Sequence, residues 1–164
     1  MKISTKKIAF VGLFIALEVI LSGTSIPVGA TRVMPLQHTL NAAAAILLGP
    51  WYAAVAGLFT AVIRFSLGTG TIFAFPGSIF GGLVVGYIYK YVKKDFAAFT
   101  EPLGTALIGG TLSGLIFAPT IGAGGTVWFF IYLFALSSIP GAIIGYFFIK
   151  LLRKVLPDFN WEEL

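Results

Sequence analysis

The sequence contains no cysteine and a single histidine, and these two shortages exclude several kinds of functional site. Without cysteine the chain has no disulfide, no thiolate metal site and no thiol nucleophile. One histidine does not supply the ligand set of a zinc site. The phosphate loop Gly-x4-Gly-Lys-Ser/Thr is missing, and no serine has an evident catalytic partner. We therefore expect no enzyme activity and no catalytic residues, no cofactor and no metal.

Charged residues are also scarce, and their scarcity defines the class of protein. They make up 10% of the chain, against about 25% in a soluble domain, and the mean hydropathy is +0.98. So little charge does not cover a water-facing exterior. The net charge of +5 comes from short basic clusters between apolar runs, a pattern that orients membrane helices and does not suit nucleic acid. We expect a multi-pass protein of the plasma membrane, in contact with the lipid bilayer and not with nucleic acid.

Long uncharged runs predict the membrane spans, because about 20 apolar residues cross a bilayer core. Leu48-Gly49-Pro50 divides a run that is too long for one span. Basic clusters near residues 2–7, 90–94 and 150–154 are separated by four and then by two of the resulting helices, which places both termini in the cytoplasm. The alternating pattern of transmembrane β-strands is missing. The sequence predicts an all-α membrane protein with one domain, residues 1–164, and six helices at about 8–25, 36–48, 51–67, 76–92, 102–118 and 127–153.

Pairs of small residues four positions apart recur on these helices and permit close approach of neighbouring helices. Gly77/Gly81, Gly82/Gly86, Gly110/Gly114 and Gly141/Gly145 are interpreted as packing inside the bundle. Gly12 and Ala16 are the exception, because a terminal helix often has one face free. We expect Gly12 and Ala16 to form a docking face for a partner membrane protein, with internal packing as the alternative.

Polar and aromatic side chains gather at the predicted outer ends of the helices. Amide and hydroxyl groups among aromatic rings suit a small, flat, largely uncharged solute, bound by stacking and a few hydrogen bonds. The alternative is an interfacial aromatic belt beside a helix-end histidine. The candidate substrate-binding residues are Gln37, His38, Asn41, Thr71, Phe75, Ser78, Trp128 and Tyr132.

Apart from the basic clusters at helix ends, two charged residues fall within predicted spans, where charge is costly. Glu18 lies near the middle of the first helix. Its alternative roles are an ion-coupling site, a structural partner of another side chain, or a substrate contact. Arg64 lies in the outer part of the third helix, where a long side chain is able to snorkel to the interface.

Several motifs resemble the ThiW family. They are PLQHTLN (35–41), LLGPWYA (47–53), Arg64, Gly70-Thr71 and AFPGS (74–78). Members of this family are substrate-binding S components of energy-coupling factor (ECF) vitamin transporters, linked to the thiazole precursor of thiamin. The resemblance implies a six-helix bundle with an outer-face pocket, capped here by residues 24–34. It also implies a membrane T component and two cytoplasmic ATPase subunits as partners. An Ala-x3-Ala pattern that commonly meets the T component is replaced here by Gly12-x3-Ala16.

The sequence is compatible with three functions. The leading hypothesis is the S component of an ATP-driven importer that binds hydroxyethylthiazole and performs no chemistry of its own. The alternative is a stand-alone secondary transporter of a small neutral solute, coupled to protons or sodium through Glu18, although no internal duplication is visible in the sequence. A membrane-embedded enzyme would need a catalytic pair, and the sequence does not offer one.

Overall fold

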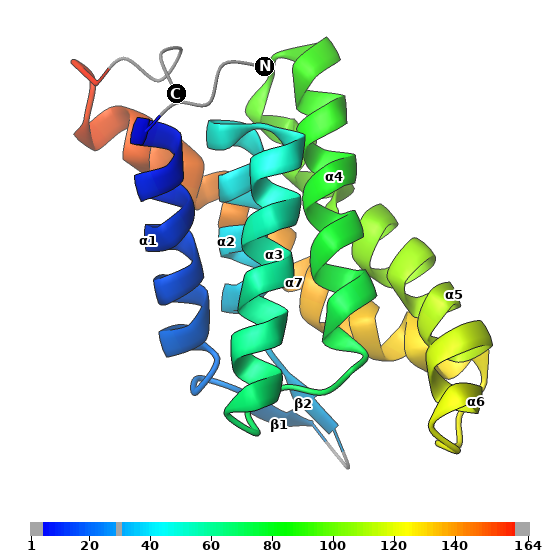
Figure 1. The fold of residues 1–164 in the computed structure, drawn as a ribbon. Coiled ribbons are helices and arrows are strands. Elements are labelled where there is room, and N and C mark those ends of the chain that lie inside the picture. The colour runs from blue at the N-terminus through cyan, green and yellow to red at the C-terminus, as the bar shows by residue number, and fades with distance from the viewer. Residues whose placement is uncertain (1–4, 29–30, 160–164) are drawn as a thin grey trace.

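The computed structural model describes residues 5–28 and 31–159, and it confirms a predominantly helical fold (Figure 1). The regular helices are α1 (Thr5–Leu21), α2 (Pro35–Leu48), α3 (Pro50–Ser66), α4 (Ala74–Val92) and α7 (Val127–Val155). Between α4 and α7, Asp95–Thr120 forms one helical segment of 26 residues. Its successive parts are the 3₁₀-helix η1 (Asp95–Thr100), the π-helix η2 (Leu103–Gly109), α5 (Gly110–Leu112), the π-helix η3 (Ser113–Phe117) and α6 (Ala118–Thr120).

The fifth helical segment differs most from its expected range of residues 102–118, because it already begins at Asp95. The added part is η1, a tight 3₁₀ stretch. It begins with Asp95 and is followed by Glu101, so it falls outside the uncharged run from which the span was predicted. The first helix, expected at residues 8–25, instead runs from Thr5 to Leu21. The remaining helices begin and end within two residues of the ranges expected for them.

A short β-hairpin stands where the all-α prediction placed only a loop. Strand β1 (Ile26–Val28) pairs antiparallel with β2 (Thr31–Val33), with Ile26 opposite Val33. Isoleucine, valine and threonine favour extended backbone because they are branched at Cβ. The hairpin joins α1 to α2 and lies at the end of the bundle where α3 ends and α4 begins (Figure 1).

The exterior of this bundle is more apolar than that of a soluble protein, and its interior holds several polar side chains beside the apolar core. Large apolar side chains such as Ile20, Phe59 and Leu115 are exposed, whereas several charged and amide side chains are buried. An exterior this apolar is suited to lipid. Two helical segments, Asp95–Thr120 and Val127–Val155, are long and apolar enough to span a membrane by themselves. Together these features support the assignment to a membrane protein.

Helix α2 forms the centre of the bundle, and nearly every one of its residues is buried. Residues 42–45 are four alanines with no exposed surface, which lets the neighbouring helices approach closely. Its most extensive contacts are with α7 and α4. Helix α1 begins and α7 ends at the end of the bundle opposite the hairpin, where α4 also ends (Figure 1).

Candidate functional site

A cavity of about 620 Å³ opens beside the hairpin end of α2. This volume falls within the range of about 300–1,000 Å³ that is usual for small-molecule pockets. Its walls come from the segment after α1, from α2, from the α3–α4 connection, and from η2 and α7. Its lining includes four polar side chains and two aromatic rings: Gln37, His38, Arg64, Ser78, Phe73 and Phe134.

Arg64 joins two walls of this cavity. Its guanidinium donates to Gln37 Oε1 through Nη1, and to the Thr69 carbonyl (3.1 Å) and the Met34 sulfur (3.0 Å) through Nη2. Gln37 in turn donates from Nε2 to Ser78 Oγ at 3.0 Å. The chain Arg64–Gln37–Ser78 therefore links α3, α2 and α4 across the cavity, and it fixes the orientation of each amide and hydroxyl group.

A buried carboxylate supports the cavity from behind. Glu101 has no exposed surface, and its Oε1 accepts hydrogen bonds from Asn41 Nδ2 (3.3 Å) and Thr105 Oγ1 (2.5 Å). The Nδ1 atom of His38 lies 2.9 Å from the same oxygen. A carboxylate only accepts, so Nδ1 carries the hydrogen and a neutral ring leaves Nε2 free to accept from a ligand. The second oxygen, Oε2, has no partner among the described residues.

Gly81 of α4 faces this carboxylate cluster at very short range. A Cβ atom at Gly81 would lie 2.6 Å from Asn41 Nδ2 and 2.7 Å from Glu101 Oε1, and closer still to Thr105 Oγ1. Real Cβ atoms do not approach other atoms so closely. Glycine at position 81 therefore allows the cluster to assemble against α4.

Four of the eight predicted substrate-binding residues line the cavity: Gln37, His38, Thr71 and Ser78. Asn41 lies one helical turn below His38 and contacts Glu101, so it supports the cavity without lining it. These five come from three separate stretches of sequence, and the folding of α2 against α4 brings them together.

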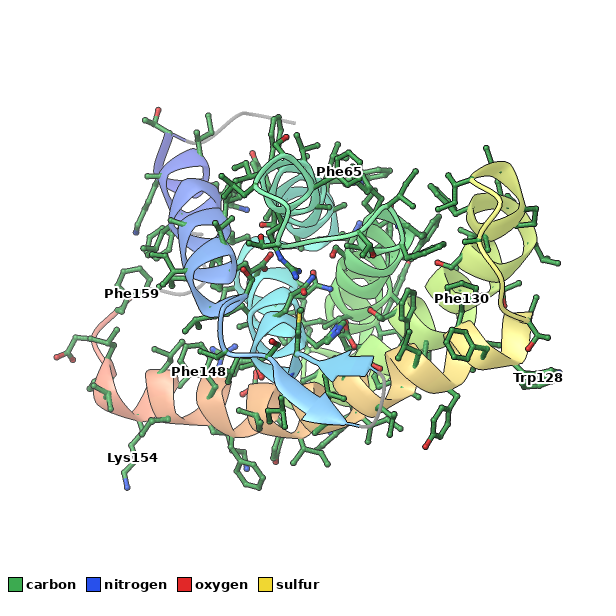
Figure 2. The ribbon with its side chains drawn as sticks, turned by 90° about the horizontal axis from the view of Figure 1, so that it is seen from below. Phe65, Trp128, Phe130, Phe148, Lys154 and Phe159 are labelled. Atoms are coloured by element: carbon green, nitrogen blue, oxygen red, sulfur yellow. The ribbon has the colours of Figure 1, made fainter. Side chains whose placement is uncertain are left out.

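The three predicted aromatic residues, Phe75, Trp128 and Tyr132, do not line this cavity, and their role in binding stays a prediction. Trp128 is 76% exposed and Tyr132 is 65% exposed, and Trp128 projects from the periphery of the bundle (Figure 2). Phe75 packs its ring edge against Phe65, with centroids 6.1 Å apart. On α7 the cavity wall is formed by Phe134, two positions after Tyr132. Two positions turn an α-helix by about 200°, so Tyr132 points to the opposite side.

The aromatic surface of the cavity comes from Phe73 and Phe134. Phe73 stacks at a tilt on Phe130, with ring centroids 4.7 Å apart, and Phe130 meets Phe134 edge-on at 6.5 Å. Phe130 is buried and contacts both of the other rings. Apolar rings and directed polar groups around one cavity suit a flat solute with a few hydrogen-bonding atoms.

Arg64 and Glu18 are both turned into the bundle. Arg64 is 2% exposed, so it does not snorkel to the interface as the sequence allowed. Glu18 is 1% exposed, faces Thr60 of α3 and lies within electrostatic reach of Arg64. Glu18 does not line the cavity. Its position favours a structural role beside Arg64 over a direct contact with a solute.

The small-residue pairs separate into two groups. An added Cβ at Gly86 would meet Pro50, one at Gly110 would meet Ile131 and one at Gly141 would meet His38, all below 3.0 Å, so these glycines serve packing inside the bundle. An added Cβ at Gly12 would meet nothing within 4 Å, and both Gly12 and Ala16 are exposed. Their face of α1 is uncovered in the described chain, and its role in docking stays a prediction.

Glu101 and Thr105 are the residues that sequence reasoning missed. Glu101 directly precedes the long uncharged run that begins at Pro102, and Thr105 follows it by one helical turn. That spacing places a carboxylate and a hydroxyl on one helix face, which is the signal that identifies the pair. No cluster of three or more His, Cys, Asp or Glu side chains able to hold a metal occurs within residues 5–28 and 31–159.

Comparison with known proteins places the chain in a family. Residues 8–155 match the model of the family described as thiamine-precursor transporter protein (ThiW). A comparison with curated proteins found no match.

Proposed function

The chain belongs to the ThiW family of thiamine-precursor transporters, and from this premise we propose that it is the substrate-binding S component of an ECF importer. The observation that carries the proposal is the 620 Å³ cavity, which is lined by both the Arg64–Gln37–Ser78 chain and the Phe73 and Phe134 rings. The protein binds and positions its solute there. ATP hydrolysis belongs to separate subunits, in keeping with the missing phosphate loop in this sequence.

The proposed solute is hydroxyethylthiazole, a neutral aromatic ring with one nitrogen acceptor and one hydroxyl group. The ring lies against Phe134, and the hydroxyl group donates to His38 Nε2, which the Glu101 contact leaves free to accept. The ring nitrogen accepts from a donor such as the Ser78 hydroxyl. Among the residues that the structure describes, Arg64 is the only cation lining the cavity, and both of its terminal nitrogens are engaged by protein atoms. This favours a neutral solute over a phosphorylated one.

The proposed membrane placement is one domain that crosses the bilayer six times, with both termini and the basic end of α4 in the cytoplasm. Its support is that α1 begins, and α4 and α7 end, at the same end of the bundle (Figure 1). The basic clusters at residues 90–94 and 150–154 lie at that end. The cavity and hairpin then face the outside, from which an importer takes its solute.

The proposed partners are a membrane T component and two cytoplasmic ATPase subunits, with the exposed Gly12 and Ala16 face of α1 as the T contact. The stand-alone carrier coupled through Glu18 is the rival function. Glu18 is buried on α1 against α3 and does not line the cavity, so no solute contact supports ion coupling there.

Two measurements test the proposal together. Calorimetry on the purified chain should show one-to-one binding of hydroxyethylthiazole, and much weaker binding of its phosphate ester. Uptake of labelled hydroxyethylthiazole by cells should stop when the genes for the ATPase subunits are deleted, and should persist in Glu18→Gln. Uptake that survives without any ATPase and is abolished in Glu18→Gln would instead establish the ion-coupled carrier.

A further inference from the structure

A second and larger cavity, about 1,250 Å³, opens at the end of the bundle opposite the hairpin. We call it the basic groove. Its floor is the turn between α2 and α3, where Gly86 of α4 packs directly against Pro50, and its sides are formed by α4 and α7. The proposed substrate cavity and the basic groove share no lining residue.

The basic groove carries a large excess of positive charge. Asp95 is the only carboxylate among the described residues that line it, and Asp95 is already paired with Arg153 at 3.1 Å. No other basic side chain of the groove forms an ion pair within the described residues. Five ammonium groups therefore have no ion-pair partner in the part of the chain that the structure describes. The six basic residues of the groove are Lys7, Lys90, Lys93, Lys94, Lys150 and Arg153.

The groove also holds hydrogen-bond donors that the described chain does not use. Tyr52 OH and Arg153 Nε are buried and have no partner among residues 5–28 and 31–159. Helix α3 begins at Pro50 on the floor of the groove without a side-chain cap, so the positive end of its dipole adds to the field of the lysines. Unpaired ammonium groups and free donors in one hollow are suited to an anion that has several oxygen acceptors.

The aromatic residues at the rim of the groove indicate which kind of molecule carries that anion. Trp51 and Tyr87 meet edge-on with centroids 6.2 Å apart, and both are exposed beside the apolar exterior. Exposed Trp and Tyr beside Lys is the arrangement found where a protein meets lipid headgroups, and basic pockets between transmembrane helices bind anionic headgroups. We propose that the basic groove binds the phosphodiester headgroup of an anionic phospholipid, with Lys90 and Lys94 of the α4 end as its principal contacts.

Lys90 and Lys94 are the best positions for a test, because they are exposed and have neither an ion pair nor a ring contact among the described residues. Lys154 offers a matched control at the same end of the bundle. It is exposed in the last turn of α7, projects away from the bundle (Figure 2) and does not line the groove. The variants are therefore the double Lys90→Gln/Lys94→Gln and the single Lys154→Gln, each checked for unchanged helix content by circular dichroism.

Binding is measured by native mass spectrometry of the purified full chain, titrated with phosphatidylglycerol, phosphatidylcholine or inorganic phosphate. We expect phosphatidylglycerol to bind best, and its affinity to fall about thirtyfold in the double variant because each lysine near a membrane surface contributes about fivefold. Lys154→Gln should bind like the wild type.

Three results would overturn the proposal. Equal binding of phosphatidylcholine would remove the role of charge. Equal loss in Lys154→Gln would show general attraction to the surface instead of a site. Tight binding of inorganic phosphate without lipid preference would assign the groove to a soluble anion. Hydroxyethylthiazole binding should be the same in all three proteins, which separates this test from that of the proposed function.

Discussion

Replacing Gly81 with alanine tests how closely the carboxylate cluster behind the cavity is packed. The added Cβ would lie 2.6 Å from Asn41 Nδ2 and 2.7 Å from Glu101 Oε1. Neither group is the end of a free side chain, because both are buried and bonded to each other. The cluster must therefore shift, and His38 shifts with it through its 2.9 Å contact to Glu101.

The magnitude follows from two opposing effects. Overpacking a core typically costs about 1–3 kcal/mol, whereas replacing glycine by alanine within a helix returns about 0.5–1 kcal/mol. Three contacts below 3.0 Å place Gly81→Ala in the upper half of the overpacking range, about 2–3 kcal/mol. The net loss is then about 1–2.5 kcal/mol, which corresponds to a fall in Tm of about 2–10 °C for a chain of this size. Gly12→Ala is the matched control, because its added Cβ would meet nothing within 4 Å. Gly12→Ala should keep the wild-type Tm or exceed it slightly.

The assay is thermal unfolding of the detergent-solubilised proteins by circular dichroism, followed by calorimetry with hydroxyethylthiazole. Gly81→Ala should unfold earlier and bind more weakly, because the displaced Glu101 no longer fixes the ring of His38. The reasoning would be refuted if Gly81→Ala and Gly12→Ala had the same Tm and the same affinity. In that case α4 would be able to move away from the cluster at no cost.

Three further predictions address topology, docking and the aromatic wall. Single cysteines at Thr69 and Gly124 should react with an impermeant reagent on intact cells, and reaction only after lysis would reverse the proposed topology. Gly12→Leu should reduce uptake and co-purification with the T component without changing solute affinity, whereas an equal loss of affinity would mean internal packing. Trp128→Ala should leave solute affinity unchanged and Phe134→Ala should lower it about tenfold or more; the opposite ranking would return Trp128 to the site.

The helical fold was predictable because it depends on composition along the chain. Uncharged runs must be helical to satisfy their backbone in lipid, and Gly49-Pro50 marks the turn between α2 and α3 where the structure places it. The hairpin was not predictable in the same way, since three residues per strand carry almost no periodic signal. The early start of the fifth segment was hidden for a similar reason, because η1 is short and contains Asp95.

The candidate site was only partly predictable, because it depends on which face of each helix points inward. Gln37, His38 and Ser78 were found from polarity alone, and the structure brings them to one cavity, although their binding role stays a prediction. Trp128 lies on a side of α7 that is exposed and does not line the cavity, and the sequence alone does not show which side of a helix faces inward. Glu101 was missed because the predicted topology separates it from His38. It places Glu101 at the cytoplasmic end of the fifth span and His38 at the outer end of the second. Only the packed bundle brings these two side chains within 2.9 Å.

The central claim is that the cavity at the hairpin end binds the solute, and a pair of serine variants tests it most directly. Ser78 lines the cavity, whereas Ser138 of α7 is fully buried, does not line it and has no hydrogen-bond partner among the described residues. Calorimetry with hydroxyethylthiazole should show affinity lowered by about fivefold to over a hundredfold in Ser78→Ala, since a lost hydrogen bond in such a site costs about 1–3 kcal/mol. Ser138→Ala should bind like the wild type. Wild-type affinity in Ser78→Ala, or an equal loss in both variants, would contradict the placement of the solute in this cavity.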